Sequence, residues 1–286
     1  MPGWVFWAAF AAAGEPVATT SLWFGGAVTT TADIRIEPEA DIAAAWSRES
    51  GAVLPDGVTS LPGSDCEVPV AGAVRVAVVL ASEEAAAGCV ESVEGLGARV
   101  GQLRTGGAEV VVALVDWGDL PLDEGALQAS HALMEDGVDV LVGYRGDGVR
   151  PVEVYETTDG RRTVIAHGMG ALSTADRGGY VYGLHPDGAG DPRDGLWVSV
   201  RAVRVAYGRD VERVQLAELV VGSTWSEPGD GGVVTVDVVA ALAAVDEALA
   251  IETSADALVA LHRRRALLVG RQARVRGVVG EHLFHR

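Results

Sequence analysis

The chain has 286 residues, 49% of them hydrophobic, and a formal net charge of −18. This length and apolar content can bury a full core in one large domain or two modest ones, which excludes a disordered chain. The negative charge repels phosphate backbones and anionic lipids, so we expect neither nucleic acid nor a membrane surface as a partner. The sequence contains no lysine and no asparagine, which excludes Schiff-base lysines, P-loop lysines and asparagine ligands.

Residues 1–67 are predicted to form a divergent N-terminal segment with one strand and loops. Residues 17–28 are rich in β-branched and aromatic side chains and contain a glycine pair, which is typical of a strand that ends in a turn. The apolar run at 4–13 lacks a basic flank and is too short to span a bilayer, so we expect no signal peptide, no membrane anchor and a cytoplasmic location. Cys66 and Cys89 lack metal-binding spacing and are expected to be free thiols.

Strands alternate with helices in the next part of the chain. The predicted elements are a hairpin or pair of strands at 68–80, a glycine-interrupted helix at 83–103, a strand at 109–115, an amphipathic helix at 122–135 and a strand at 138–142. The run EVVVALV at 109–115 is continuously apolar, as expected for a strand covered on both faces. A strand, helix and strand of these lengths predict a βαβ unit and a sheet that is parallel in part.

Beyond residue 142 the pattern changes to antiparallel hairpins. The segments VEVYE and RTVIAHG flank Asp159-Gly160, and WVSVRAVRVAY and VERVQLAELVV flank residues 208–210. We therefore predict an α/β core over residues 68–235, followed by C-terminal helices in residues 236–286. The last helix carries a cluster of arginines, which suits the negative end of its dipole; docking on an acidic surface is the alternative.

Three blocks between residues 110 and 173 carry a further pattern. They read VVALVDWG at 111–118, ALMEDGVDVLVG followed by YRGDGVRPVEVY at 132–155, and TVIAHGMGAL at 163–172. In order and spacing they resemble the CapA-type family of capsule and poly-γ-glutamate biosynthesis proteins, which are similar to calcineurin-type metallophosphatases. The matching residues are Gly143, Pro151, Val152, Glu153, Val154, Tyr155 and Gly170. The resemblance implies an α/β, metallophosphatase-like mixed-sheet sandwich with flanking helices, a truncated N-terminal half and a helical C-terminus.

The departures from the family pattern fall on the residues that would bind metal. Asp116 stands where the family has the histidine before Trp-Gly, and Tyr144, Arg145 and Asp147 replace three histidines. Metal sites of this kind depend on such imidazoles, so the resemblance implies a degenerate member without a metal cofactor. We expect a non-catalytic binding or assembly subunit linked to capsule-type biosynthesis, with a protein partner or a second copy of the chain bound to it.

One alternative is an enzyme. Asp116 and Asp147 are predicted to follow neighbouring parallel strands, at the edge where α/β sheets bind ligands, and His167 follows a later strand. Two carboxylates and an imidazole could hold Mn or Mg, or act as acid and base. This combination would give a metal-dependent hydrolase or an amide-forming enzyme.

The other alternative is a binder of an anionic small molecule. Arg145 and Arg150, beside Tyr144, could hold a ligand such as a glutamyl chain. The planar guanidinium fork matches the geometry of a carboxylate, which makes arginine suited to that task.

Overall fold

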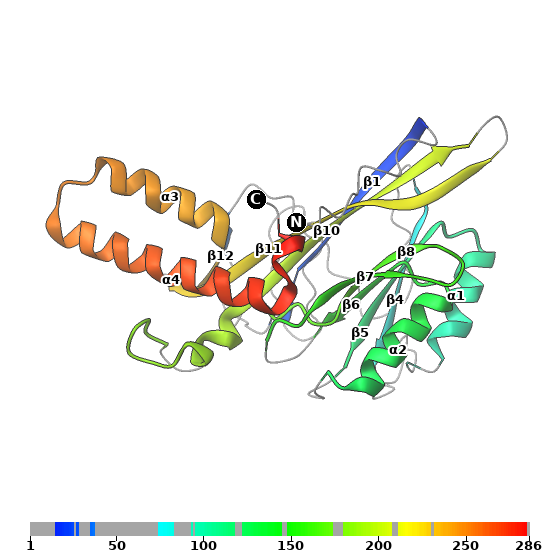
Figure 1. Cartoon of the computed structure of the whole chain (residues 1–286), viewed down its shortest axis with the longest axis horizontal. Coiled ribbons are helices and arrows are strands. Elements are labelled where there is room, and N and C mark those ends of the chain that lie inside the picture. The colour runs from blue at the N-terminus through cyan, green and yellow to red at the C-terminus, as the bar shows by residue number, and fades with distance from the viewer. Residues whose placement is uncertain are drawn as a thin grey trace, which may run out of the picture.

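The computed structural model describes residues 15–25, 27–28, 35–37, 74–82, 93, 95–117, 122–144, 148–173, 180–207, 211–229 and 232–284. Within them the chain forms two five-stranded sheets, a two-stranded sheet and four α-helices (Figure 1). Both larger sheets contain parallel and antiparallel neighbours. The predicted α/β class with mixed sheets is therefore confirmed.

One of the larger sheets, here called the parallel sheet, contains the βαβ unit. Its strands are β4 (Val76–Ser82), β5 (Val110–Asp116), β6 (Val140–Tyr144), β7 (Val152–Glu156) and β8 (Arg162–Ala166). Their order is β4-β5-β6-β8-β7, with β4, β5, β6 and β8 parallel and β7 antiparallel to β8. The predicted hairpin β7-β8 is present, and its turn places Gly160 at φ +82°, a conformation that favours glycine. This hairpin inserts β8 between β6 and β7, so one of its strands extends the parallel part of the sheet.

Helices α1 (Leu96–Thr105) and α2 (Glu124–Glu135) cover one face of the parallel sheet (Figure 1). Asp123 caps α2, because its carboxylate accepts a hydrogen bond from the backbone N–H of Ala126 at 2.9 Å. Gly137, at φ +115°, allows the sharp turn from α2 into β6. The predicted strand, helix and strand are therefore confirmed.

Some predicted features lie outside the described residues. They are Cys66, Cys89, the apolar run at 4–13, residues 68–73 of the expected hairpin, and most of the first half of the helix expected at 83–103. The described parts of the last two features are β4 and α1.

The other larger sheet, here called the long sheet, joins distant parts of the chain. Its strands, in spatial order, are β1 (Glu15–Gly25), β10 (Asp194–Ala206), β11 (Glu212–Gly229), β12 (Gly232–Asp237) and β3 (Arg35–Glu37). Strand β3 runs parallel to β12, and the other neighbours are antiparallel. The predicted hairpin around residues 208–210 is β10-β11, with strands of 13 and 18 residues. A small parallel sheet pairs β2 (Ala27–Val28) with β9 (Ala171–Ser173).

The two larger sheets share an apolar core. Alternate residues of β5, namely Val110, Val112 and Leu114, meet residues of β10 such as Val198 and Val200. The intervening residues of β5 point to the other face and pack with α1 and α2. All seven residues of β5 are buried, as predicted for a strand covered on both faces. Along each strand, alternation decides which of the two layers a side chain enters.

The chain ends in a helical hairpin of α3 (Val238–Ile251) and α4 (Ala255–Val279), which confirms the helices predicted after residue 235. Asp237 starts α3, because its carboxylate accepts the backbone N–H of Ala240 at 2.9 Å and the indole N–H of Trp197 at 2.6 Å. The hairpin extends away from the parallel sheet, at the other end of the molecule (Figure 1). Among the described residues, no helix is long and apolar enough to cross a membrane.

Candidate functional site

The carboxyl edge of the parallel sheet is where the predicted site residues gather. Asp116 is the last residue of β5, in register with Ser82 of β4 and Tyr144 of β6. Its exposed fraction is 3%. Arg145 and Asp147 lie outside the described residues, as does the side chain of Tyr144. Asp116 is therefore at the expected edge, and the roles of Arg145 and Asp147 stay predictions.

His167, just after β8, belongs to a network of two imidazoles and one carboxylate. Its Nε2 lies 3.4 Å from Oε2 of Glu153 on β7, and Nε2 of His131 on α2 lies 3.0 and 3.1 Å from the two oxygens of the same carboxylate. The ring of Tyr155 stacks on His131 with 4.4 Å between ring centres. Burial lowers the pKa of His167, and the hydrogen bond and charge of Glu153 partly offset this effect.

Asp116 and His167 lie on opposite faces of the parallel sheet. Asp116 has the same parity as Leu114, which faces the core between the sheets. His167 has the same parity as Ile165, which packs with the layer of α1 and α2, and its contact with Glu153 beside α2 agrees with that placement. Within the described residues, the side chains of Asp116 and His167 therefore point away from each other and do not form the shared site that we expected. Nor do the described His, Cys, Asp and Glu side chains form any group of three or more that could hold a metal ion.

Arg150 packs beside His167 and Gly168. Its backbone N–H donates to the carbonyl oxygen of Gly168 at 2.9 Å. A Cβ atom on Gly168 would lie 2.8 Å from Cγ of Arg150, and one on Gly143 would lie 2.2 Å from the carbonyl oxygen of His167. Gly143 needs glycine because the backbone of His167 passes too close for a side chain, and a side chain at position 168 would displace that of Arg150. The structure thus brings Arg150, Glu153 and His167 together at this edge.

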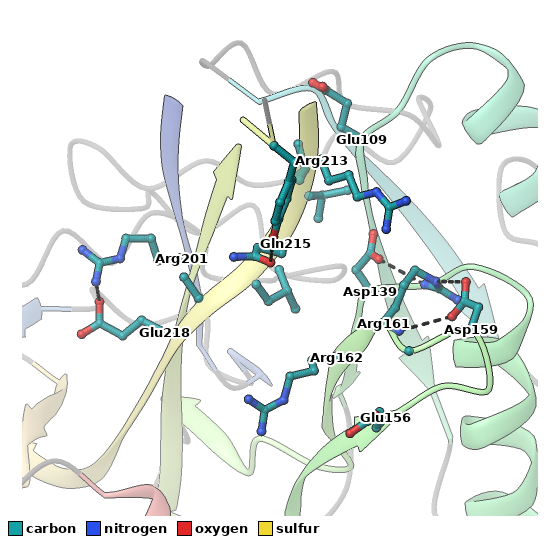
Figure 2. Close-up of a pocket in the computed structure, with 16 residues that line it drawn as sticks. Glu109, Asp139, Glu156, Asp159, Arg161, Arg162, Arg201, Arg213, Gln215 and Glu218 are labelled. Atoms are coloured by element: carbon teal, nitrogen blue, oxygen red, sulfur yellow. Dashed lines mark hydrogen bonds and ion pairs between the residues drawn. The ribbon is translucent and has the colours of Figure 1, made fainter. Parts of the chain in front are cut away.

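A cleft of about 690 Å³ lies at the opposite, amino edge of the parallel sheet, between that edge and the hairpin β10-β11 (Figure 2). Its lining includes four arginine and five acidic side chains. They come from the starts of β5, β6 and β8, the end of β7, and both strands of the hairpin. This cleft combines a ligand-sized volume with many polar groups.

Asp139 fixes the wall of the cleft that the parallel sheet provides. Its carboxylate accepts hydrogen bonds from the backbone N–H of Val111 at 2.7 Å, from Arg104 at 2.5 Å and from Arg161 at 3.2 Å. Burial raises the pKa of Asp139, and the two arginines and the backbone N–H partly offset this effect. One buried carboxylate thereby ties the beginnings of β5, β6 and β8 to α1.

A second ion pair fixes the other wall, which the hairpin provides. A guanidinium nitrogen of Arg204 on β10 donates to the two oxygens of Glu109 at 2.7 and 2.6 Å. Burial alone would raise the pKa of Glu109, but the bonds and charges of Arg204 and Arg75 lower it below its ordinary value. Glu109 directly precedes β5, so this contact fastens the long hairpin to the parallel sheet.

Neither the cleft nor the pairing of His131 with Glu153 has a motif in the sequence. A weaker signal for the cleft exists: Arg161 and Arg162 follow the Asp159-Gly160 turn, and turns place their flanking residues at a sheet edge.

No protein-family model matches the chain, and no curated protein matches it.

Proposed function

We propose that the chain is a non-catalytic binding protein on a CapA-type, metallophosphatase-like sandwich frame, with a role in capsule or poly-γ-glutamate biosynthesis. The observation that carries the proposal is the placement of Asp116 and His167 on opposite faces of the parallel sheet. The two large sheets with a shared core, and α1 and α2 on the outer face, support the sandwich frame. The link to capsule biosynthesis rests on the resemblance within residues 110–173.

The directions of the Asp116 and His167 side chains bear on the choice between binding and catalysis at the carboxyl edge. Metal-assisted or acid–base hydrolysis requires its groups to reach the same reacting atom or its neighbours. Asp116 follows the face that enters the core, whereas Nε2 of His167 faces Glu153 and α2. Side chains that point to opposite faces of a sheet point away from each other, which does not favour action on one substrate atom. Binding of a ligand or partner elsewhere on the frame makes no such demand.

The test is a hydrolysis assay with added Mn²⁺, Mg²⁺ or Zn²⁺ on bis(p-nitrophenyl) phosphate, together with calorimetric titration of each ion. The variants are Asp116→Asn, His167→Gln and Asp147→Ala, and Asp256→Asn on exposed α4 is the matched control. We expect that any turnover of the wild type is the same in the first three variants as in the control. Circular dichroism of each variant establishes that it is folded before its activity is compared.

One outcome would overturn the proposal. Stoichiometric metal binding and turnover that both disappear in Asp116→Asn and in Asp147→Ala, with the control unchanged, would establish a remodelled metal-dependent hydrolase instead. Loss in His167→Gln as well would mean that His167 reaches the reacting group, against the placement described above.

A second candidate role, assembly with another copy of the chain, is favoured by the surface of the helical hairpin. Five of the eight large aliphatic side chains exposed in the described residues lie on α3 and α4: Val239, Ile251, Val259, Val269 and Val278. On α3, most exposed residues between Val239 and Ile251 are alanines. A second copy of the chain packed against this hairpin would cover these exposed aliphatic side chains.

Sedimentation velocity over a range of protein concentrations tests this second role. A dimer that weakens in Ile251→Glu, but not in Val211→Glu at the exposed start of β11, would support it. A monomer at every concentration would refute it and leave the binding role unaffected.

A further inference from the structure

We propose that His131, Glu153 and His167, here called the histidine cluster, form a proton-controlled contact that fastens α2 to the hairpin β7-β8 at neutral pH and loosens it in mild acid. The cluster joins three elements, because His131 lies on α2, Glu153 on β7 and His167 directly after β8. This inference goes beyond the proposed function, since it concerns the response of the outer layer of the fold to pH and does not depend on a ligand.

One carboxylate serves two imidazole rings in the histidine cluster. Nε2 of His131 lies 3.0 Å from one oxygen of Glu153, and Nε2 of His167 lies 3.4 Å from the other oxygen. Because an ionised carboxylate can only accept hydrogen bonds, the hydrogen of each neutral ring belongs on Nε2. Two neutral histidines thus donate to one carboxylate, and the three side chains connect the helix layer with the edge of the parallel sheet.

The other ring nitrogen of His167 has no place for a proton in this arrangement. The side chain of His167 is 1% exposed, and its Nδ1 is buried without a hydrogen-bond partner among the described residues. Protonation would add a hydrogen to Nδ1, and a buried donor on a charged ring is costly when it lacks an acceptor. Burial accordingly lowers the pKa of His167 from its ordinary value of 6.5, and the hydrogen bond and charge of Glu153 partly offset this effect.

Positive charges near His167 also oppose its protonation. The charge of His131, when that ring is protonated, and the charge of Arg150 both lower the pKa of His167. Glu153 carries a single negative charge and can balance only one imidazolium. We therefore expect His167 to take up its proton in an open form of the cluster, in which the ring reaches solvent.

The direction of the pH response follows from the lowered pKa of His167. The open form binds the proton more tightly than the closed form, so the contribution of neutral His167 to the closed form is complete above pH 6.5 and is lost as the pH falls below that value. The pairing of protonated His131 with Glu153 acts in the opposite direction. Both of these side chains are 35% exposed, and ion pairs at such positions contribute little. Acid should therefore loosen the histidine cluster.

The C-terminal end of α2 has contacts of its own. The carboxylate of Glu135 accepts hydrogen bonds from the hydroxyl of Tyr155 at 2.9 Å and from that of Thr158 at 2.7 Å, and the ring of Tyr155 also stacks on His131. Hydrogen bonds from Thr158 and Tyr155 lower the pKa of Glu135, so this carboxylate stays ionised in mild acid. The end of the helix therefore stays attached, and we expect the part of α2 up to His131 to open first.

Amide hydrogen exchange of the full chain, followed by NMR between pH 5 and pH 8 and corrected for the intrinsic rate at each pH, tests the inference. The opening constant of the amides of residues 128–131 should rise as the pH falls below 6.5, by up to about tenfold per pH unit for one linked proton. Helix α1 packs on the same face of the parallel sheet and contains no histidine, so its amides are the internal control and should not show this rise. An equal rise in both helices would overturn the inference.

Variants of the chain identify the group that takes up the proton. His167→Gln keeps a side-chain N–H donor for Glu153 but cannot be protonated, so the pH dependence of α2 should disappear in it and persist in His262→Gln on exposed α4. PH dependence retained in His167→Gln would overturn the inference. An NMR titration of the His167 ring in the wild type needs no variant: its midpoint should lie below pH 6.5, and a midpoint at or above that value would equally overturn it. These outcomes are independent of the metal-dependent turnover that tests the proposed function.

Discussion

Replacement of Arg271 by methionine should destabilise the protein by about 3–5 kcal/mol at neutral pH, because it leaves a buried carboxylate without its partner. Arg271 lies on α4, and its side chain is 2% exposed. Its Nε donates to Asp194 at 2.9 Å, and a second nitrogen donates to Asp191 at 2.8 Å. Its guanidinium carbon lies 5.2 Å from the ring centre of Trp225 and 5.6 Å from that of Tyr180. One cation therefore joins α4 to the beginning of β10 and to β11.

The pH dependence of this loss follows from Asp194. Burial raises the pKa of Asp194 from 3.8 to about 6, and the bonds and charge of Arg271 oppose that rise. Because the folded state holds the proton more tightly, the contribution of Asp194 to stability is greatest below pH 3.8 and falls as the pH rises to about 6. Two pKa units correspond to about 3 kcal/mol. Without Arg271 the pKa of Asp194 rises further, so the fall in stability extends into the neutral range.

Urea unfolding followed by tryptophan fluorescence at pH 5 and pH 7.5 measures the effect. The difference between wild type and Arg271→Met should be smaller at pH 5, where Asp194 is protonated in both proteins, than at pH 7.5. Arg274→Met is the matched control, because Arg274 pairs with Asp191 at an exposed position. The double variant Arg271→Met with Asp194→Leu should recover most of the loss. A loss below about 1 kcal/mol, or an equal loss at both pH values, would refute the reasoning.

Two further predictions concern close packing and capping. Gly143→Ala should lower the stability by about 3 kcal/mol or more, because the added Cβ would lie 2.2 Å from the carbonyl oxygen of His167. In the control Gly148→Ala the added Cβ meets no atom within 4 Å, so this change should be nearly neutral. Thermal unfolding compares the two variants, and equal shifts in the melting temperature would contradict the packing argument. Asp237→Ala should cost about 2–3 kcal/mol and Asp123→Ala about 1 kcal/mol, because both residues cap a helix but only the first also accepts an indole N–H. Equal losses in urea unfolding would show that the indole contact contributes nothing.

Local sequence patterns predicted the helices and strands well, but they predicted less well which strands pair in the sheets. The apolar run of β5, the Asp123 cap and the turn at Gly137 are encoded within a few residues of each other, so the βαβ unit could be read from the sequence. The insertion of β8 between β6 and β7 could not, because the hairpin pattern fixes only the pairing of β7 with β8. The pairing of β1 with β10, across most of the chain, is likewise set by the core that the two sheets share.

Local patterns also do not encode which distant side chains meet, and this explains why Asp116 and His167 do not share a face at the carboxyl edge. The sequence correctly places Asp116 at the end of a parallel strand, but the uniformly apolar run of β5 does not predict which face its side chain enters. The face of His167 depends on the strand that precedes it, and that strand reaches its place through a hairpin of independent register. Its neighbours His131 and Glu153 come from α2 and β7, whose proximity no local pattern encodes. A motif of residue types at one edge therefore did not determine whether their side chains converge.

Hydrogen bonds and ion pairs hold both walls of the cleft at the amino edge. Asp139 anchors Arg104, Arg161 and the backbone of β5, so one wall of the cleft is rigid before a ligand arrives. The ion pair of Arg204 with Glu109 fastens the opposite wall to it. Preorganised walls lower the entropic cost of binding, which suits a protein whose task is to hold a ligand. Such a site needs no metal-binding imidazoles at the carboxyl edge. On the proposed CapA-type frame, Asp116, Tyr144, Arg145 and Asp147 stand where that family has histidines, and a binding function at the other edge of the same sheet does not depend on those positions.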